Sequence, residues 1–167
     1  AEEGSIILFG VPPLSPKAGY GYIELENKKG RYKDLTPIRA FHEKPTLQKA
    51  KLMIKSDNFL WNSGVFLFSA KRILHEAKLL RPDMLASVEL AVQNRTTTGS
   101  LEKLDHHHWV KIVAESVDHA IMENTDNLSC GRFEGPWSDL GDWNAVAEKS
   151  GRDESGNFKS GSAIPFE

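Results

Sequence analysis

The apolar positions of this chain form short, separate blocks bounded by glycine, proline and polar residues. Five blocks carry the apolar, β-branched or aromatic residues that favour strands. They cover residues 6–9, 20–26, 38–43, 65–68 and 128–133. The first and fourth blocks are continuous apolar runs, which are typical of strands buried on both faces of a sheet. Each block therefore predicts one strand.

Between these blocks, apolar residues recur at helical spacing. This spacing predicts helices after Thr46 and after Ser69, because both hydroxyl groups are placed to cap a first turn. Pro82 ends the second helix or starts the next, and shorter helices are predicted at residues 116–122 and 143–149. Because strands alternate with helices, the fold class is α/β, with a mostly parallel sheet flanked by helices.

Several polar stretches predict loops. Residues 94–100 have the composition of a loop, residues 28–33 that of a basic hairpin tip, and residues 151–161 that of a polar tail. The histidines at 106–108 also predict a solvated loop, since three consecutive side chains cannot converge on one ion from a regular helix or strand.

Composition and charge exclude several classes of protein. With 167 residues, 40% hydrophobic and 26% charged, the chain has the profile of one globular domain. Its 21 Lys and Arg against 23 Asp and Glu leave no basic surface for nucleic acid or membrane. No apolar run approaches the roughly 20 residues that cross a bilayer. Cys130, the only cysteine, predicts a packed thiol and a reducing, cytoplasmic setting.

Three segments carry polar groups suited to a hydroxylated, phosphorylated ligand. Gly21 lies at a turn into a strand, where a ligand can approach its backbone closely. Glu43 and Lys44 end another predicted strand, and can accept hydrogen bonds from hydroxyls and neutralise a phosphate. Asn62 precedes the most apolar strand and offers both donor and acceptor. Taken singly, ordinary turns and a surface ion pair explain these segments at least as well.

A fourth segment, WSDLGDW at residues 137–143, places two carboxylates and two tryptophans around a glycine. Asp139 can be a hard oxygen ligand for Mg²⁺, which usually takes one or two carboxylates together with phosphates and water. Asp142 is better placed to cap the following helix. No Gly-rich phosphate loop of the GxGxxG or GxxxxGK[ST] kind occurs in the chain.

Together these segments resemble the nucleotide-sugar pyrophosphorylases, and among them the branch that makes GDP-mannose. The resemblance is carried by GYGYIE from Gly19, FHEKP from Phe41, WNSGVFLF from Trp61, SVDHAIMENT from Ser116 and WSDLGDW from Trp137. It implies a Rossmann-like nucleotidyltransferase fold, with Gly21, Glu43 and Asn62 contacting mannose. It also implies that Lys44 contacts the sugar phosphate and that Asp139 holds Mg²⁺, so that these two residues are the catalytic ones.

The implied reaction converts mannose 1-phosphate and GTP to GDP-mannose and pyrophosphate. The chain departs from the family pattern at Lys17 and Ala18, and at His119, where the family usually has a tyrosine. The family's Gly-rich nucleotide loop has no counterpart here. We therefore expect residues 1–167 to be a single partial domain that binds the sugar phosphate, is inactive alone and is open to homo-oligomer formation through its strand edges.

Two other functions remain open at this point. One is a non-catalytic sugar-phosphate-binding or regulatory module, which would keep Glu43, Lys44 and Asn62 but gain nothing from a metal ion. The other is a sister pyrophosphorylase that uses glucose 1-phosphate. The dependence of ligand binding on Mg²⁺ distinguishes the first, and a panel of sugar phosphates distinguishes the second.

Overall fold

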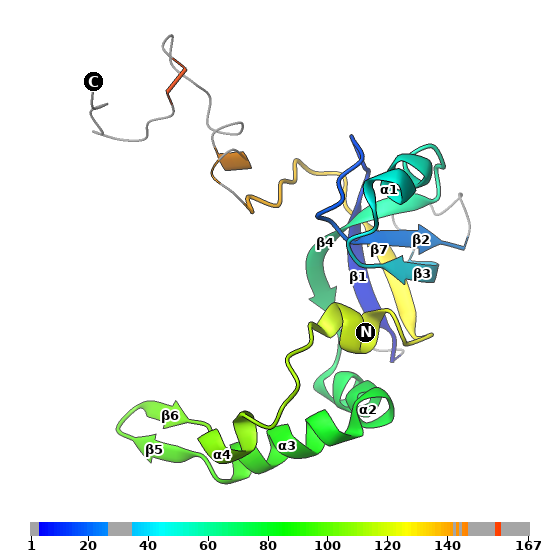
Figure 1. Cartoon of the computed structure of the whole chain (residues 1–167). Helices are drawn as coiled ribbons and strands as arrows, with labels where there is room; N and C mark the ends of the chain where they lie inside the picture. The colour runs from blue at the N-terminus through cyan, green and yellow to red at the C-terminus, as the bar shows by residue number, and fades with distance from the viewer. Residues whose placement is uncertain (1–3, 27–34, 142, 144, 147–155, 158–167) are drawn as a thin grey trace. The chain divides into compact units, whose positions relative to one another are not determined.

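The computed structural model describes residues 4–26, 35–141, 143, 145–146 and 156–157 (Figure 1). The chain divides into two compact units, Ala1–Glu134 and Gly135–Glu167, and each is taken here by itself. The helices and strands given below all belong to the first unit. That the chain is a single partial domain stays a prediction.

A five-stranded sheet forms the centre of the first unit. Its strands are β1 (Ile6–Val11), β2 (Tyr22–Leu25), β3 (Thr36–His42), β4 (Phe59–Leu67) and β7 (Leu128–Arg132). The strand order is β1–β4–β2–β3–β7, and β7 also pairs with β1. All five predicted strands are therefore present, although β4 begins well before the apolar run that predicted it.

The α/β class holds, but the strand directions correct one part of the expectation. Among the described strands of this sheet, β1 and β7 run parallel, whereas the other four pairings are antiparallel. A parallel pair needs a long crossover, but neighbours along the chain such as β2 and β3 can pair antiparallel through a short connection. The apolar runs indicated burial, and burial carries no information about direction.

The segment Trp61–Gly64 lies inside β4 and is not the turn before a strand that the sequence suggested. Asn62 pairs with Gly10 of β1, and the register then shifts so that the strand bulges near Gly64. Gly64 has a φ of 74°, a conformation open to glycine at little cost. The strand therefore passes through the glycine, which periodicity alone does not reveal.

The longer helices are α1 (Leu47–Met53), α2 (Ala70–Leu80) and α3 (Pro82–Gln93). Both predicted caps are confirmed, because the Thr46 hydroxyl accepts from the Lys49 N–H and the Ser69 hydroxyl from the Arg72 N–H. Pro82 is the first residue of α3, where its missing N–H costs nothing. In the part of the chain that the structure describes, no helix is both long and apolar enough to span a bilayer.

Two stretches predicted as loops are regular instead. Thr96–Thr98 forms β5 and pairs with β6 (Leu101–Lys103), because threonine favours strands and Gly99 turns the chain with a φ of 61°. The three histidines begin α4 (His106–Trp109), since the Asp105 carboxylate caps the helix by accepting the His108 N–H at 3.0 Å.

Some predictions fall outside the described residues. They are the basic hairpin tip at 28–33, the cap at Asp142 and, apart from residues 156–157, the tail at 151–161. Of the helix predicted at 143–149, residues 143, 145 and 146 are described, and they are helical.

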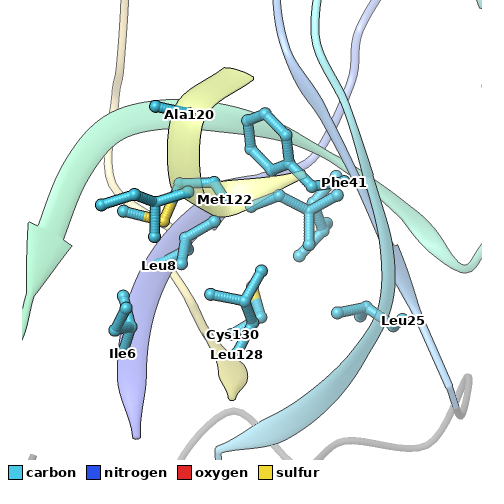
Figure 2. Close-up of a cluster of buried hydrophobic side chains, with 11 residues drawn as sticks. Ile6, Leu8, Leu25, Phe41, Ala120, Met122, Leu128 and Cys130 are labelled. Atoms are coloured by element: carbon cyan, nitrogen blue, oxygen red, sulfur yellow. The ribbon is translucent and has the colours of Figure 1, made fainter. Parts of the chain in front are cut away.

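The core of the first unit joins the sheet to η1 (Asp118–Met122), a single π-helical turn, as Figure 2 shows. Its buried members are Ile6, Leu8, Ile23, Leu25, Phe41, Leu60, Ala120, Ile121, Met122, Leu128 and Cys130. Burial raises the pKa of the Cys130 thiol to about 11, so the prediction of a packed thiol is confirmed. Because the apolar residues of η1 lie in this core, the polar residues at its ends have fixed positions.

Candidate functional site

Gly21, Glu43 and Asn62 come together although they are far apart in the sequence. The Asn62 N–H donates to the Gly21 carbonyl at 2.8 Å. A Cβ atom on Gly21 would lie 2.8 Å from Glu43 Oε2 and 3.2 Å from Asn62 Cβ. No side chain fits there without displacing a neighbour, which explains a glycine at this position. Three of the residues expected to contact the sugar therefore share one location.

Lys44 joins this group through an unusual backbone turn. β3 ends at His42, and Lys44 has a φ of 44°, in the left-handed region that residues with a side chain rarely adopt. The turn brings Lys44 Nζ to 3.1 Å from Glu43 Oε1. The Glu43 side chain is only 9% exposed, whereas that of Lys44 is 66% exposed. The carboxylate is therefore fixed, while the ammonium remains free to meet a ligand.

The Asn62 side chain is held from two sides. Its Oδ1 accepts the Gly64 N–H at 3.1 Å, and its Nδ2 donates to Asp118 Oδ1 at 3.4 Å. The first bond lies within the bulge of β4, and the second reaches η1. The amide thus has a defined orientation, with an oxygen and an NH₂ group available in known directions.

The structure adds three residues that sequence reasoning had not assigned, all at the ends of η1. Asp118 contacts Asn62, and Glu123 Oε1 accepts the Glu43 N–H at 2.9 Å. His119 Nδ1 lies 2.8 Å from Glu123 Oε2. These residues belong to the SVDHAIMENT motif, whose two carboxylates on either side of an apolar triplet were the available signal. Single π-turns are uncommon and frequently occur at functional sites.

The acidic groups of this cluster affect one another. Burial raises the pKa of Asp118, and the nearby negative charge of Glu43 raises it further. Burial also opposes ionisation of Glu123, but hydrogen bonds from the Glu43 N–H and from His119 outweigh it and lower the pKa of Glu123. The hydrogen bond to Glu123 raises the pKa of His119, as do the charges of Glu43 and Asp118. The site therefore offers ionised acceptors, balanced by Lys44 and His119.

Asp139 belongs to the second unit and is described there alone. Leu140 has a φ of 49°, and a Cβ on Gly141 would collide with the Asp139 carboxylate, so a tight turn surrounds this group. One carboxylate suits the way Mg²⁺ binds, with phosphates and water completing its shell. The described residues contain no group of three His, Cys, Asp or Glu side chains arranged to hold a metal by themselves. The metal role of Asp139 stays a prediction.

The family model for nucleotidyl transferases matches residues 1–156, and the chain belongs to that family. A mannose-1-phosphate guanylyltransferase from Sinorhizobium fredii (strain NBRC 101917 / NGR234) is 37% identical over 163 residues, which are 96% of this chain and 31% of that protein. One from Escherichia coli is 34% identical, with 100% and 36% covered. The chain spans about a third of the length of these curated relatives.

Solved structures give the same fold. A protein from Helicobacter pylori, described as a mannose-6-phosphate isomerase, matches with a TM-score of 0.74 and 30% identity, covering 83% of this chain and 53% of that one. A protein from Thermus thermophilus, described as a mannose-1-phosphate geranyltransferase, also gives 0.74 at 25% identity, covering 92% and 42%. The fold is thus the α/β, Rossmann-like fold of nucleotidyltransferases, a family that generally uses a divalent metal ion and acts on nucleotide sugars.

Proposed function

We propose that this chain is the sugar-phosphate-binding part of an enzyme that makes GDP-mannose from mannose 1-phosphate and GTP. The observation that carries the proposal is the meeting of Gly21, Glu43, Lys44 and Asn62 at one location. A sugar phosphate needs acceptors and donors for its hydroxyls and a cation for its phosphate, and these residues supply them. The names of the relatives from Sinorhizobium fredii and Escherichia coli support mannose as the sugar.

In the proposed reaction, a phosphate oxygen of mannose 1-phosphate attacks the α-phosphorus of GTP in line. The bond from that phosphorus to the bridging oxygen breaks, and pyrophosphate leaves with the electron pair. Glu43 accepts hydrogen bonds from sugar hydroxyls, and the Asn62 amide fixes the orientation of the ring. The Lys44 ammonium turns from Glu43 to the phosphate and holds the attacking group, so no covalent enzyme intermediate is needed.

Asp139 would hold Mg²⁺ as one carboxylate ligand, with substrate phosphates as others. When bound, the ion supplies neutralisation of the phosphate charge. We place the enzyme in the cytoplasm, in keeping with a buried free thiol.

The test uses the whole protein that contains this chain. Pyrophosphate release is measured with GTP and Mg²⁺ in the presence of mannose 1-phosphate or glucose 1-phosphate. We expect release with the mannose compound at a kcat/KM at least about tenfold above that with the glucose compound, a difference of about 1.4 kcal/mol. A preference for glucose 1-phosphate would favour the sister enzyme. Binding of mannose 1-phosphate without turnover, and without any effect of Mg²⁺, would favour a non-catalytic module.

A further inference from the structure

We propose that Glu123 is a positioning residue, which holds the Glu43–Lys44 turn in the conformation that binds the sugar phosphate. The inference rests on the proposed function and extends it to a residue at the end of η1. It begins from one contact, the hydrogen bond that Glu123 Oε1 accepts from the Glu43 N–H at 2.9 Å.

This contact lies where the sheet stops supporting the chain. The last paired position of β3 opposite β2 is His42, which faces Tyr22. Glu43 follows directly, and its N–H finds a carboxylate 80 residues further along the chain. Glu123 therefore takes over at the point where the strand ladder ends.

The turn itself needs such support. Lys44 adopts a left-handed φ of 44°, a conformation that persists in a residue with a side chain only where the surroundings fix it. Fixing the N–H of the preceding residue restrains the backbone that leads into this turn. Without that bond, Lys44 can relax toward an ordinary conformation, and its ammonium then leaves the Glu43 carboxylate.

Glu123 is itself well anchored. Ala120, Ile121 and Met122 lie in the core just before it, and the Glu123 N–H donates to the Asp118 carbonyl at 2.9 Å. Its second oxygen, Oε2, is bound to His119 Nδ1 at 2.8 Å. Because both carboxylate oxygens already have partners, Glu123 acts on the ligand through Glu43. It is a link from the core to the turn.

The experiment compares three variants in the whole protein. Glu123→Ala removes the acceptor, whereas Glu123→Gln keeps an oxygen for the Glu43 N–H and an NH₂ group for His119. Glu115→Ala is the matched control, because Glu115 pairs with Arg81 at 2.7 Å just before η1 without contacting Glu43. For each variant we measure kcat and KM for both substrates, and also hydrogen exchange of the peptide containing residue 43 without ligand.

Glu123→Ala should raise KM for mannose 1-phosphate about tenfold, the effect of losing one hydrogen bond to a charged group, with little change in kcat or in KM for GTP. Exchange at residue 43 should accelerate about tenfold as well. Glu123→Gln should restore both quantities to within about threefold. Glu115→Ala should leave them at the wild-type values.

Three results would overturn the inference. The first is wild-type exchange at residue 43 in Glu123→Ala, and the second is fast exchange with an unchanged KM for mannose 1-phosphate. The third is an equal loss in Glu123→Ala and Glu115→Ala, which would mean a merely structural role. If the wild-type protein neither binds nor turns over mannose 1-phosphate, the proposed function fails, and the exchange data still decide whether Glu123 holds the turn.

Discussion

The Lys44 ammonium lies 3.1 Å from the Glu43 carboxylate, although adjacent side chains of a regular strand point to opposite faces. The pair can meet because β3 ends at His42 and Lys44 turns into the left-handed region. Two neighbours in the sequence can thus serve one ligand, with the carboxylate on the hydroxyls and the ammonium on the phosphate. A change in this single turn affects both contacts at once.

Lys44→Ala should weaken binding of mannose 1-phosphate much more than binding of free mannose, because only the phosphate contact is lost. The expected loss is about 1.5–3 kcal/mol, the range for a hydrogen bond to a charged group. Lys44→Arg should recover part of it, since a planar guanidinium does not reproduce a compact ammonium. Calorimetry on the whole protein measures both ligands. Equal losses for the sugar and its phosphate would mean that Lys44 is structural.

Gly21→Ala should damage the sugar site with little loss of fold. The added methyl group would lie 2.8 Å from Glu43 Oε2, and this carboxylate can move aside whereas the backbone stays in place. We expect mannose 1-phosphate affinity to fall at least about tenfold, or about 1.4 kcal/mol. Gly19→Ala is the matched control, because a Cβ there would meet nothing within 4 Å. If both variants bind like the wild type, Gly21 does not border the sugar.

Local signals in the sequence were sufficient for much of the fold. The hydroxyl caps at Thr46 and Ser69 and the apolar run of β1 depend on residues a few positions apart, so the sequence shows them directly. The course of β4 through Gly64 depends on pairing with β1, which is distant in the sequence. Asn62 was therefore expected at a turn, and it lies within a strand.

The candidate site divides in the same way. Glu43 and Lys44 stood out because a strand end followed by proline has a local signature, and their motif carried the family resemblance. Asp118 and Glu123 were missed as site residues because their partners lie 56 and 80 positions away. No periodicity links such positions, so only the folded chain brings them together.

Asp139→Asn should lower turnover far more than it weakens mannose 1-phosphate binding. The change removes charge from a proposed metal ligand and keeps most of its shape, so we expect kcat to fall roughly a hundredfold or more. Steady-state kinetics over a Mg²⁺ series measure the effect, and Asp57→Asn, at an exposed position, is the control. Unchanged turnover at saturating Mg²⁺ would remove Asp139 from the site.

Glu76→Ala should strongly destabilise the first unit. Glu76 is 3% exposed, and its carboxylate accepts bonds from Arg72, Thr125 and Asn127 at 2.8–3.1 Å. Its loss leaves a half-buried Arg72 without its partner, a change that costs about 3–5 kcal/mol. Glu76→Gln should cost less, and Glu89→Ala, on the exposed side of α3, almost nothing. Denaturant unfolding checks these values, and a loss below about 1 kcal/mol for Glu76→Ala would contradict the prediction.

The contact between His119 and Glu123 predicts a pH window for this corner of the molecule. The hydrogen bond to Glu123 raises the pKa of His119, so the stability from this histidine is complete below about pH 6.5 and is lost as the pH rises through the raised value. The pKa of Glu123 is lowered, so its contribution is complete above about pH 4.3 and is lost as the pH falls through the lowered value. The paired form is therefore favoured most between these limits.

Glu123→Gln should move the pKa of His119 back toward about 6.5, because the ring loses its ionised acceptor. An NMR titration of the His119 ring protons measures the shift directly. Glu102→Ala is the control, since Glu102 pairs with Arg95 at 3.1 Å and touches neither member of the pair. About half of the His119 side chain is exposed, so solvent screens the pair and the effect on overall unfolding should be small. A His119 titration that is the same in Glu123→Gln and in the wild type would mean that the two groups do not interact in solution.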